Sequence, residues 1–483
     1  MDIVSSLRRA ARRHGARVFL FDMETSVTYE AADLYTNAIA AGLVSRGVTD
    51  GVTLGLAASD RVGLWLAIIG AWKAGALPGL IDARTNQDDL PYFVGDVGAP
   101  LVAAAPELTD RLRAAGAAEI IDLGSLGDSG GEDQPDHHGP QAPLFLSYTS
   151  GTTGAPKGVV LLSEPVTLGT RCIADRLCLT QEDILLATTP ISSSFQLVAA
   201  LMPAIHAGAA VGLVAGCPVT EIWSVADRAH ASVLVAYPLT LADIVNHRPD
   251  GRHRSSFRLA LSGGSPLAPR IKRDYRDQLG IDLLESYGQS ELGGFMAMGR
   301  EKDGDQVLSG FVGRPLSDRL AYVGGPDGTE LPAGTVGEVL VGDGFFSEYR
   351  NKPDKTAEAK EGGVLHTGDL AVADKDGYLK VLGRTREAKS AAERGGFLRE
   401  LEDAYYEHPD VLHATVVEGE SGDIGAFVEL RTGSIPSSGE IEKVAVARVP
   451  PGLAPAKTTV LDKMPRTFSG KADRRTLAAA VDT

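Results

Sequence analysis

The sequence predicts an α/β fold, with parallel-rich sheets covered by helices and a β-rich stretch after them. Short apolar runs such as Val52–Ala58 and Leu77–Ile81 alternate with helical patterns such as Val62–Lys73. Strands that alternate with helices form parallel sheets covered on both faces. The 483 residues exceed one ordinary core, so we expect at least two domains. A content of 43% hydrophobic and 23% charged residues is typical of a soluble globular protein.

Charge and cysteine content exclude several classes of function. The formal net charge is −16, which argues against a nucleic-acid-binding surface, because such a surface needs a basic patch. A local cradle can still be positive enough for a nucleotide. Cys172, Cys178 and Cys217 form no Cys-x-x-Cys pair, so neither a disulfide framework nor a zinc site is supported.

The expected location is the cytoplasm. Four arginines between positions 8 and 13 are not followed by an apolar segment, so no signal peptide is predicted. Leu197–Gly216 is a run of about twenty residues without a formal charge, the length of a membrane span. It contains Pro203 and several glycines, and we interpret it as a buried helix, a turn and a buried strand.

The remaining elements follow in order along the chain. Apolar residues recur at helical spacing from Ala31 to Leu43, and Gly47 ends that helix. The Gly-, Asp- and His-rich stretch Gly124–Gln141 predicts a solvated linker, and its His137–His138 pair has no partners at metal-ligand spacing. Asp376–Gly377 is a hairpin turn signal. Further strands are predicted at Leu101–Ala104, Pro143–Leu146, Val159–Leu162, Ile184–Ala187, Ala210–Val214, Ser232–Ala236, Leu259–Leu261 and Gly337–Val341.

The chain is organised around a loop between two of these strands, Leu146–Val160. Its glycines let backbone approach a ligand, because glycine has no Cβ and tolerates positive φ. Hydroxyls at Thr149, Ser150, Thr152 and Thr153 and consecutive N–H groups form an anion cradle, to which Lys157 adds a charge. It is not a Walker loop, because a glycine and a strand follow the lysine. The alternative is an ordinary surface turn.

The string from Tyr148 to Gly158 resembles the signature loop of the adenylate-forming superfamily, which includes acyl- and aryl-CoA ligases, nonribosomal adenylation domains and luciferases. The resemblance covers nearly the whole chain. It implies that the cofactors are ATP and magnesium, with CoA as a further candidate. It also implies that the loop holds the β- and γ-phosphates of ATP. The residues implied there are Thr149, Ser150, Gly151, Thr152, Thr153, Gly154 and Lys157.

Two further strings match the same family. Ser262–Leu267 resembles the segment that lies against adenine and the acid, which implicates Gly263, Gly264 and Ser265. Glu285–Glu291 resembles the Tyr-Gly-x-Thr-Glu motif, with Ser290 in place of threonine. The resemblance assigns the Ser290 hydroxyl to the α-phosphate and Glu291 to magnesium, a hard cation that prefers carboxylate oxygen. The adenine-binding residues implied by this string are Glu285, Ser286, Tyr287 and Gly288.

The resemblance extends to the C-terminal part. Asp369 stands in a Thr-Gly-Asp motif and Arg384 in a Gly-Arg motif, and the family binds ribose with both. The family hinge falls at Arg386, which predicts an N-terminal core domain over residues 1–385 and a small mobile α+β lid over 386–483. Near the end, Lys471 stands in a motif like the family's Pro-x-Thr-x-x-Gly-Lys, whose lysine bridges the acid and the α-phosphate.

The chain departs from its relatives at two places. After the hinge, Ala388–Arg394 is charged and alanine-rich, and Gly395 and Gly396 are displaced from the family's positions. In the CoA ligases of the family, this segment lines the tunnel that holds the pantetheine arm of CoA. Because burying unpaired charge in such a tunnel is costly, we expect CoA to be a poor acceptor. After Pro190, a histidine of many relatives is absent and hydroxyl residues replace it, which favours a compact, polar or aromatic acid. The expected acid pocket comprises Ser193, Ser194, Phe195, Tyr237 and Gly263.

The sequence therefore predicts an AMP-forming ligase. It would activate a small, carboxylic acid as an acyl-adenylate with release of pyrophosphate and pass it on, by default to CoA or a carrier-protein thiol. Two alternatives stay open. One is an adenylating enzyme with a non-thiol acceptor such as an amine, including an ATP-dependent diazotase-like enzyme that uses nitrite. The other is a non-catalytic nucleotide-binding relative, against which Lys471, Glu291 and Asp369 argue.

Overall fold

The computed structural model describes most of the chain. The described residues are 2–59, 61–128, 139, 142–149, 156–249, 256–300, 303–304, 308–316, 321–342, 346–467 and 469–483. Within them the strands form four sheets of nine, seven, four and three strands. This mixed α/β architecture confirms the predicted fold class, with parallel-rich sheets, a β-rich subdomain and a C-terminal α+β part.

The seven-stranded sheet carries the loop Leu146–Val160, which the sequence analysis singled out. Strands β7, β4, β3, β5 and β6 pair in parallel. Strands β7 and β8, which lie on either side of the loop as predicted, pair antiparallel. In order across the sheet the strands are β18 (Phe346–Tyr349), β8 (Gly158–Leu162), β7 (Pro143–Tyr148), β4 (Leu77–Leu80), β3 (Thr53–Ala57), β5 (Leu101–Ala104) and β6 (Ile120–Asp122).

The nine-stranded sheet brings two predicted motifs to one edge. Strands β12 and β13 pair in parallel with Ser262 opposite Glu285, so the residues after β12 lie beside the second half of β13. Ligands bind at such carboxyl edges of parallel strands. In order the strands are β15 (Arg314–Pro315), β14 (Gly294–Met298), β13 (Asp282–Gln289), β12 (Leu259–Ser262), β11 (Val233–Ala236), β9 (Ile184–Ala187), β10 (Ala210–Leu213), β1 (Val18–Phe21) and β2 (Ser26–Thr28).

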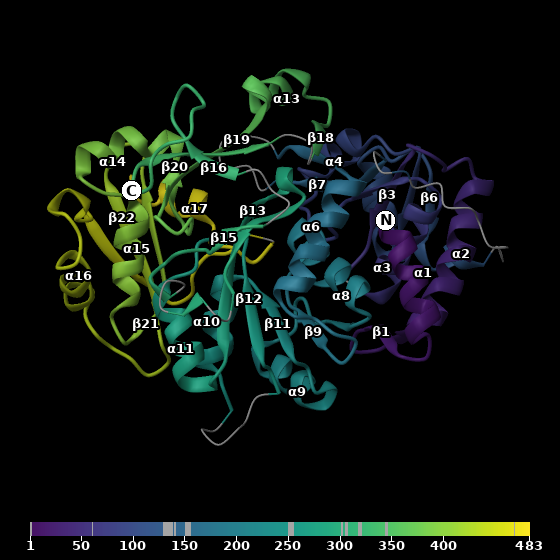
Figure 1. The fold of residues 1–483 in the computed structure, drawn as a ribbon, viewed down its shortest axis with the longest axis horizontal. Helices are drawn as coiled ribbons and strands as arrows, with labels where there is room; N and C mark the ends of the chain where they lie inside the picture. Colours follow the sequence, from purple (N-terminus) through teal and green to yellow (C-terminus); the bar gives the residue numbers. More distant parts are fainter. Residues whose placement is uncertain are drawn as a thin grey trace.

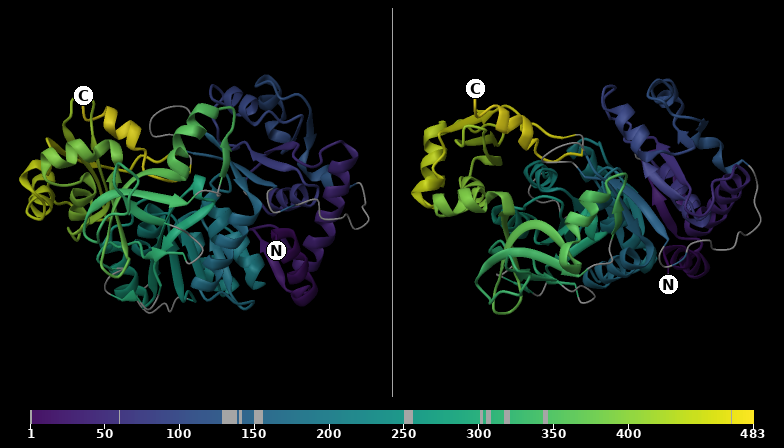
Figure 2. Two further views of the ribbon diagram at one scale, coloured as in Figure 1. Left: turned by 45° about the horizontal axis from the view of Figure 1, so that its top comes forward. Right: turned by 90° about the horizontal axis from the view of Figure 1, so that it is seen from above.

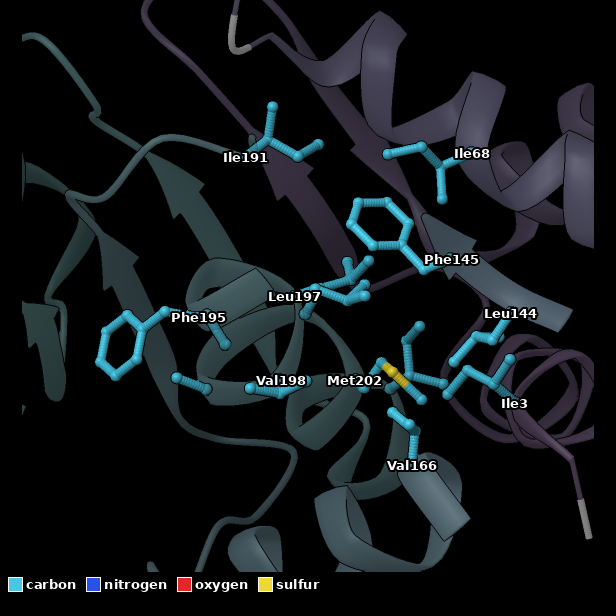
Figure 3. Packing of buried hydrophobic residues seen from close by; sticks show 14 of the residues in the cluster. Ile3, Ile68, Leu144, Phe145, Val166, Ile191, Phe195, Leu197, Val198 and Met202 are labelled. Atoms are coloured by element: carbon cyan, nitrogen blue, oxygen red, sulfur yellow. The ribbon is translucent and has the colours of Figure 1, made fainter. Parts of the chain in front are cut away.

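Helices pack both large sheets into one core. The main apolar cluster contains residues of both sheets, such as Phe145 and Val211, together with residues of several helices. Figure 3 shows Ile3 and Phe195 at opposite ends of the drawn part of this cluster. The helices of this region are α1 (Ile3–His14), α2 (Tyr29–Ser45), α3 (Val62–Lys73), α4 (Leu90–Val97), α5 (Thr109–Ala114), α6 (Ser163–Arg176), α7 (Ser194–Gln196), η3 (Leu197–Leu201), α8 (Met202–Ala207), α9 (Val219–Ala229), α10 (Pro238–Asn246) and α11 (Pro269–Leu279).

The long uncharged run has the predicted structure. Leu197–Gly216 forms the π-helical turn η3, helix α8 and strand β10, with Gly208 in the left-handed conformation between the last two. No helix among the described residues has the length and apolarity needed to cross a membrane. Of the predicted linker Gly124–Gln141, the first part lies in the turn η2 (Leu123–Gly127), whereas His137 and His138 lie outside the described residues.

The last third of the chain forms two smaller sheets. One contains β16 (Ala321–Gly324), β17 (Val336–Gly342), β19 (Val364–Ala373) and β20 (Leu379–Arg384); Asp376–Gly377 turns between the last two, as predicted. The other contains β21 (Val411–Glu418), β22 (Ile424–Leu430) and β23 (Lys457–Leu461). The helices here are α13 (Pro353–Ala359), α14 (Ala388–Arg394), α15 (Leu398–Tyr406), α16 (Ser438–Val446) and α17 (Arg474–Ala479).

The elements from α14 onward lie at one end of the molecule, opposite α1 and α2 (Figures 1 and 2). They pack against the nine-stranded half through a shared apolar cluster that joins Leu241 of α10 and Ile271 of α11 to Leu401 and Tyr405 of α15. The C-terminal part is therefore docked on the core in this structure, with its last segment directed at the edge where β12 and β13 end.

Candidate active site

A cavity of about 710 Å³ opens at the carboxyl edge of the nine-stranded sheet. Segments from all parts of the chain line it, including β13, β19 and the last segment before α17. The residues predicted from the sequence that line it are Thr149, Lys157, Ser193, Ser194, Phe195, Tyr237, Gly264, Gly288, Ser290, Glu291, Arg384 and Lys471.

The described ends of the loop between β7 and β8 are held together. The Thr149 N–H donates to the Lys157 carbonyl at 3.0 Å, and the Lys157 N–H donates to the Thr149 hydroxyl at 3.2 Å. The Lys157 ammonium lies 3.9 Å from the centre of the Tyr349 ring. Burial lowers the pKa of Lys157, while the nearby Glu291 carboxylate opposes that shift. The predicted residues Ser150, Gly151, Thr152, Thr153 and Gly154 lie outside the described residues.

Ser290 and Glu291 follow β13 in the short helix η4 (Ser290–Leu292). The Glu291 carboxylate is buried, lines the cavity and accepts a hydrogen bond from the Tyr349 hydroxyl at 2.7 Å. The Ser290 hydroxyl lies 3.3 Å from that of Ser194. One carboxylate at a cavity wall fits magnesium, which takes one or two carboxylates together with water and substrate phosphates. The described residues contain no cluster of three or more metal-binding side chains.

Asp369 is the centre of a hydrogen-bonded group beside the cavity. Its carboxylate is buried and pairs with the Arg384 guanidinium at 3.0 Å. It also accepts hydrogen bonds from the Tyr287 hydroxyl at 2.8 Å and from the Gln289 amide at 2.5 Å. Burial raises the pKa of Asp369, while the Arg384 charge opposes that shift. The adjacent Thr367 and Gly368 line the cavity. Arg384 lies beside Asp369, where the resemblance placed it, whereas the hydrogen bonds from Tyr287 and Gln289 were not predicted. The ribose-binding role of this group stays a prediction.

The segment after β12 makes a close backbone wall. Gly264 has φ +72°, and a Cβ there would lie 2.8 Å from the Tyr237 ring and 3.4 Å from the Lys471 ammonium. A Cβ on Gly263 would meet both the Ser286 hydroxyl and the Phe195 ring within 2.5 Å. Side chains larger than hydrogen are therefore excluded at both positions.

Other residues of the predicted adenine set have different neighbours. Glu285 is buried and forms an ion pair with Lys272 at 2.6 Å, and it accepts from the Leu267 N–H at 3.2 Å. This carboxylate is turned into the protein, because a buried charge needs a partner. The Ser286 hydroxyl donates to the Ser262 carbonyl at 2.7 Å. The Ser265 hydroxyl donates to the Gly264 carbonyl at 2.9 Å.

Aromatic rings and hydroxyls form the wall where the acid is expected. The centroid of the Phe195 ring lies 5.3 Å from the centroid of the Tyr237 ring and 5.6 Å from that of the Phe295 ring. The hydroxyls of Ser193 and Tyr237 lie 2.5 Å apart. Burial raises the pKa of Tyr237 to about 12, so its hydroxyl stays protonated near neutral pH. This part of the cavity therefore has packed aromatic rings on one side and hydroxyl groups that can form hydrogen bonds on another.

Lys471 reaches this cavity from the C-terminal part. Its ammonium lies 5.1 Å from the centre of the Tyr237 ring, and the Lys471 carbonyl accepts a hydrogen bond from the Thr467 N–H at 2.8 Å. Burial lowers the pKa of Lys471 to about 8, and the Arg384 charge adds to the shift. The two positive groups therefore face the same space, which favours an anionic occupant.

Several cavity residues were missed by the sequence analysis. Tyr349 contacts both Lys157 and Glu291, and Gln289 contacts Asp369. Asp82 follows β4, lines the cavity and accepts from the Ser192 hydroxyl at 2.5 Å. Tyr349 and Asp82 belong to no predicted motif, and Gln289 stands at the variable position of the Tyr-Gly-x-Thr-Glu-like string, so only the fold shows what these side chains contact.

Positive groups from three distant parts of the chain and one buried glutamate thus face a single cavity at a carboxyl edge. That arrangement suits an anionic ligand such as a nucleotide polyphosphate. Comparison with known proteins agrees. Residues 7–349 match the family model described as AMP-binding enzyme, and residues 400–471 match that of the AMP-binding enzyme C-terminal domain. The chain belongs to the AMP-binding enzyme family of the adenylate-forming superfamily, and it is an AMP-forming ligase.

Individual relatives and one solved structure show what this chain is similar to. The chain is 32% identical over 342 residues to sulfoacetate–CoA ligase of Cupriavidus necator, a match that spans 69% of this chain and 66% of that relative. It is 26% identical to feruloyl-CoA synthase of an Amycolatopsis species, over 95% of this chain and 94% of the relative. The fold matches the crystal structure of an anthranilate CoA ligase in complex with anthranoyl-AMP, with TM-score 0.90, 21% identity and coverage of 100% of this chain and 97% of that one.

The predicted domain boundary falls between the two family matches. Arg386 is in the single turn η7 (Thr385–Glu387) directly after β20. Neither family model includes residues 350–399. A hinge at Arg386, and with it the division into residues 1–385 and 386–483, therefore stays a prediction.

Proposed function

We propose that this protein activates a compact acid with ATP as an acyl-adenylate and then transfers the acyl group to an acceptor. The observation that carries the proposal is the convergence of Lys157, Glu291, Arg384 and Lys471 on one cavity. Lys471 comes from the C-terminal part, so the site is complete only with that part docked. A non-catalytic relative would not need a half-buried lysine placed there.

The reaction is a displacement at the α-phosphorus of ATP. An oxygen of the acid carboxylate attacks that phosphorus, the bond to the β-phosphate oxygen breaks, and pyrophosphate leaves. Lys471 would stabilise the negative charge shared by the acid and the α-phosphate, and the Ser290 hydroxyl would donate to a phosphate oxygen. Catalysis would consist mostly of positioning and charge neutralisation. Magnesium held at Glu291 would supply further neutralisation of phosphate charge.

Other residues would bind the nucleotide without reacting. Asp369 and Arg384 would hold ribose, and Tyr287 with Gly263 and Gly264 would hold adenine. The network of Asp369 supports this role, because Arg384, Tyr287 and Gln289 fix its carboxylate next to the cavity. A carboxylate fixed in this way loses little entropy when it accepts a hydroxyl.

The wall near Phe195 favours a small acid. Phe195 fills the space beside Gly263, where a Cβ would already touch the ring. Phe295 and Tyr237 pack on the same ring, so the floor cannot recede without repacking a buried cluster. We therefore propose a compact acid with a polar group that meets the Ser193 and Tyr237 hydroxyls, in preference to a long acyl chain.

The acceptor has two candidates. CoA is the acceptor in the names of the relatives above, and CoA or a carrier-protein thiol is the default here. A non-thiol acceptor such as an amine is favoured by one observation. The segment after the hinge folds as helix α14, whose Lys389 and Glu393 side chains are exposed, and only Ala391 of that helix is buried.

The test is pyrophosphate exchange into ATP with a panel of acids that includes sulfonated, aryl, short aliphatic and long acyl acids and nitrite. Exchange with a compact acid supports the proposed adenylation, and exchange with nitrite alone supports the diazotase-like alternative. Absence of exchange with every acid, together with tight ATP binding, would favour the non-catalytic alternative. Adding CoA, a carrier protein or an amine to the active acid then identifies the acceptor.

A further inference from the structure

Helix α13 forms a wall of the cavity that no predicted motif includes. Lys352, just before the helix, and Lys355, Glu358 and Ala359 within it line the cavity together with Lys157. The helix is drawn at the top of the molecule beside β18 in Figure 1. It brings two further ammonium groups to the side of the cavity where Lys157 lies.

The segment that carries α13 is fixed to the end of the β7–β8 loop that leads into β8. Strand β18 pairs with β8, with Tyr349 opposite Val159, and the Arg350 N–H donates to the Gly158 carbonyl at 2.7 Å. The Lys352 ammonium donates to the Tyr92 hydroxyl at 2.9 Å, and that hydroxyl donates to the Pro156 carbonyl. Because these bonds are made by the backbone and by half-buried groups, α13 keeps its place relative to Lys157.

Lys355 differs from the neighbouring lysines in what it contacts. The Lys360 ammonium donates to the carbonyls of Phe346 and Ser347, which ties the end of the helix to β18. Lys355 instead forms an ion pair at 2.6 Å with Glu358 on its own helix, and their side chains are 60% and 67% exposed. Such an exposed pair contributes little to folding. Its ammonium is therefore available to a ligand in the cavity.

The charges of α13 reach Lys157. Burial is the main cause of the lowered pKa of Lys157, but the Lys355 charge lowers it further and the Glu358 charge opposes the shift. An anion bound at Lys157 would therefore be attracted by Lys355 and repelled by Glu358. The terminal phosphates of ATP, and the pyrophosphate formed from them, are anions of that kind.

We propose that Lys355 is a positioning residue for the terminal phosphates of ATP and for the outgoing pyrophosphate, with Glu358 as its competing partner. The inference rests on the proposed function for the choice of ligand. Lys355 leaves Glu358 and pairs with a phosphate oxygen when the nucleotide is bound, so α13 forms the second wall of the polyphosphate site. AMP, which lacks the terminal phosphates, gains nothing from this wall.

The experiment measures binding of ATP, pyrophosphate and AMP to the full chain by calorimetry with magnesium present. Lys355→Gln should weaken ATP and pyrophosphate binding about fivefold, the effect of one partly exposed charge pair, and leave AMP binding unchanged. Glu358→Gln should act in the opposite direction and tighten pyrophosphate binding. The control is Lys375→Gln, in the exposed turn between β19 and β20, which should change none of the three.

Two results would overturn the inference. One is an equal loss of ATP and AMP affinity in Lys355→Gln, which would indicate a general structural effect. The other is weaker pyrophosphate binding in Glu358→Gln. This outcome does not depend on the panel of acids. If no acid supports exchange but the binding pattern is found, the proposed function is wrong and the proposed role of Lys355 in binding the terminal phosphates is still supported.

Discussion

Lys471 is the residue on which the proposed chemistry depends most. Replacing it with alanine removes one preorganised charged donor and should lower the adenylation rate by about two orders of magnitude or more, equivalent to about 2.7–4 kcal/mol. ATP binding should persist, because the contacts at Lys157 and Asp369 are unchanged. The measurement is pyrophosphate exchange together with ATP titration. Near-normal exchange in Lys471→Ala would remove this residue from the reaction.

The environment of Lys471 also predicts a pH dependence. Its pKa is lowered to about 8, so the ammonium is present below that pH and is lost as the pH rises through it. Because kcat/KM reports the free enzyme, kcat/KM for adenylation should fall as the pH increases above about 8. The check is a profile from pH 6 to pH 10. A curve that stays flat through this range would show that the neutral amine suffices.

Asp369 should affect the nucleotide, not the acid. Asp369→Ala removes the carboxylate that Arg384, Tyr287 and Gln289 hold, and it should raise the KM for ATP while the fold persists. Since ribose is common to ATP and AMP, the affinity for AMP should fall as well. Calorimetric titration with both nucleotides tests this. Unchanged affinities would mean that Thr367–Asp369 is only a structural turn.

At the scale of elements, the prediction about the acceptor depends on helix α14. Its charged face should suit water better than the wall of a narrow pantetheine tunnel, so CoA should be a poor acceptor that does not saturate at micromolar concentration. Removing the charges in the double variant Lys389→Ala/Glu393→Ala should then improve turnover with CoA. The measurement is acyl-CoA formation from the active acid, compared with product formation from an amine.

One result would contradict this prediction and indicate an ordinary acyl-CoA ligase. It is efficient acyl-CoA formation that is lost when Gly395 or Gly396 is replaced by a bulky residue. Gly395 has φ +77° and ends α14, and a Cβ on Gly396 would lie 2.5 Å from the Glu400 carboxylate. Stability of these variants therefore has to be measured beside their activity.

At the scale of the whole molecule, Asp243 joins the C-terminal part to the core. Its carboxylate, on α10, accepts from Arg466 at 2.7 Å and lies 2.7 Å from the buried His413 ring. Burial raises the pKa of Asp243, but the hydrogen bonds and charges of His413 and Arg466 outweigh burial and lower it overall. Arg466 lies in the segment that carries Lys471, so we expect this network to hold the lysine at the cavity.

Asp243→Ala should leave the Arg466 charge without its partner and lower the free energy of unfolding by about 3 kcal/mol. It should also slow adenylation, because Lys471 would be held less firmly. Urea denaturation and pyrophosphate exchange measure the two effects. The control is Asp110→Ala in the exposed pair with Arg113, which should change stability by less than about 0.5 kcal/mol. Equal effects in both variants would show that the Asp243 network does not hold the C-terminal part.

The sequence by itself determined the fold class and the position of most elements. The pattern at Val62–Lys73 gave helix α3 with the same bounds, and Leu197–Gly216 gave a helix, a turn and a strand. These features depend on periodicity and on glycine, which act within a few neighbouring residues. Short motifs also singled out Lys157, Glu291 and Lys471, which all line the cavity, because each motif is a run of neighbouring residues; their roles stay predictions.

Only the tertiary structure decided what these residues contact. Tyr349 bridges Lys157 and Glu291, Lys272 turns Glu285 into the protein, and α13 adds its charges to the cavity. None of these partners is close in the sequence to the group it serves. Their meeting depends on strand pairing and on the packing of whole elements, which pair residues far apart in the chain without leaving a local pattern for the sequence to show.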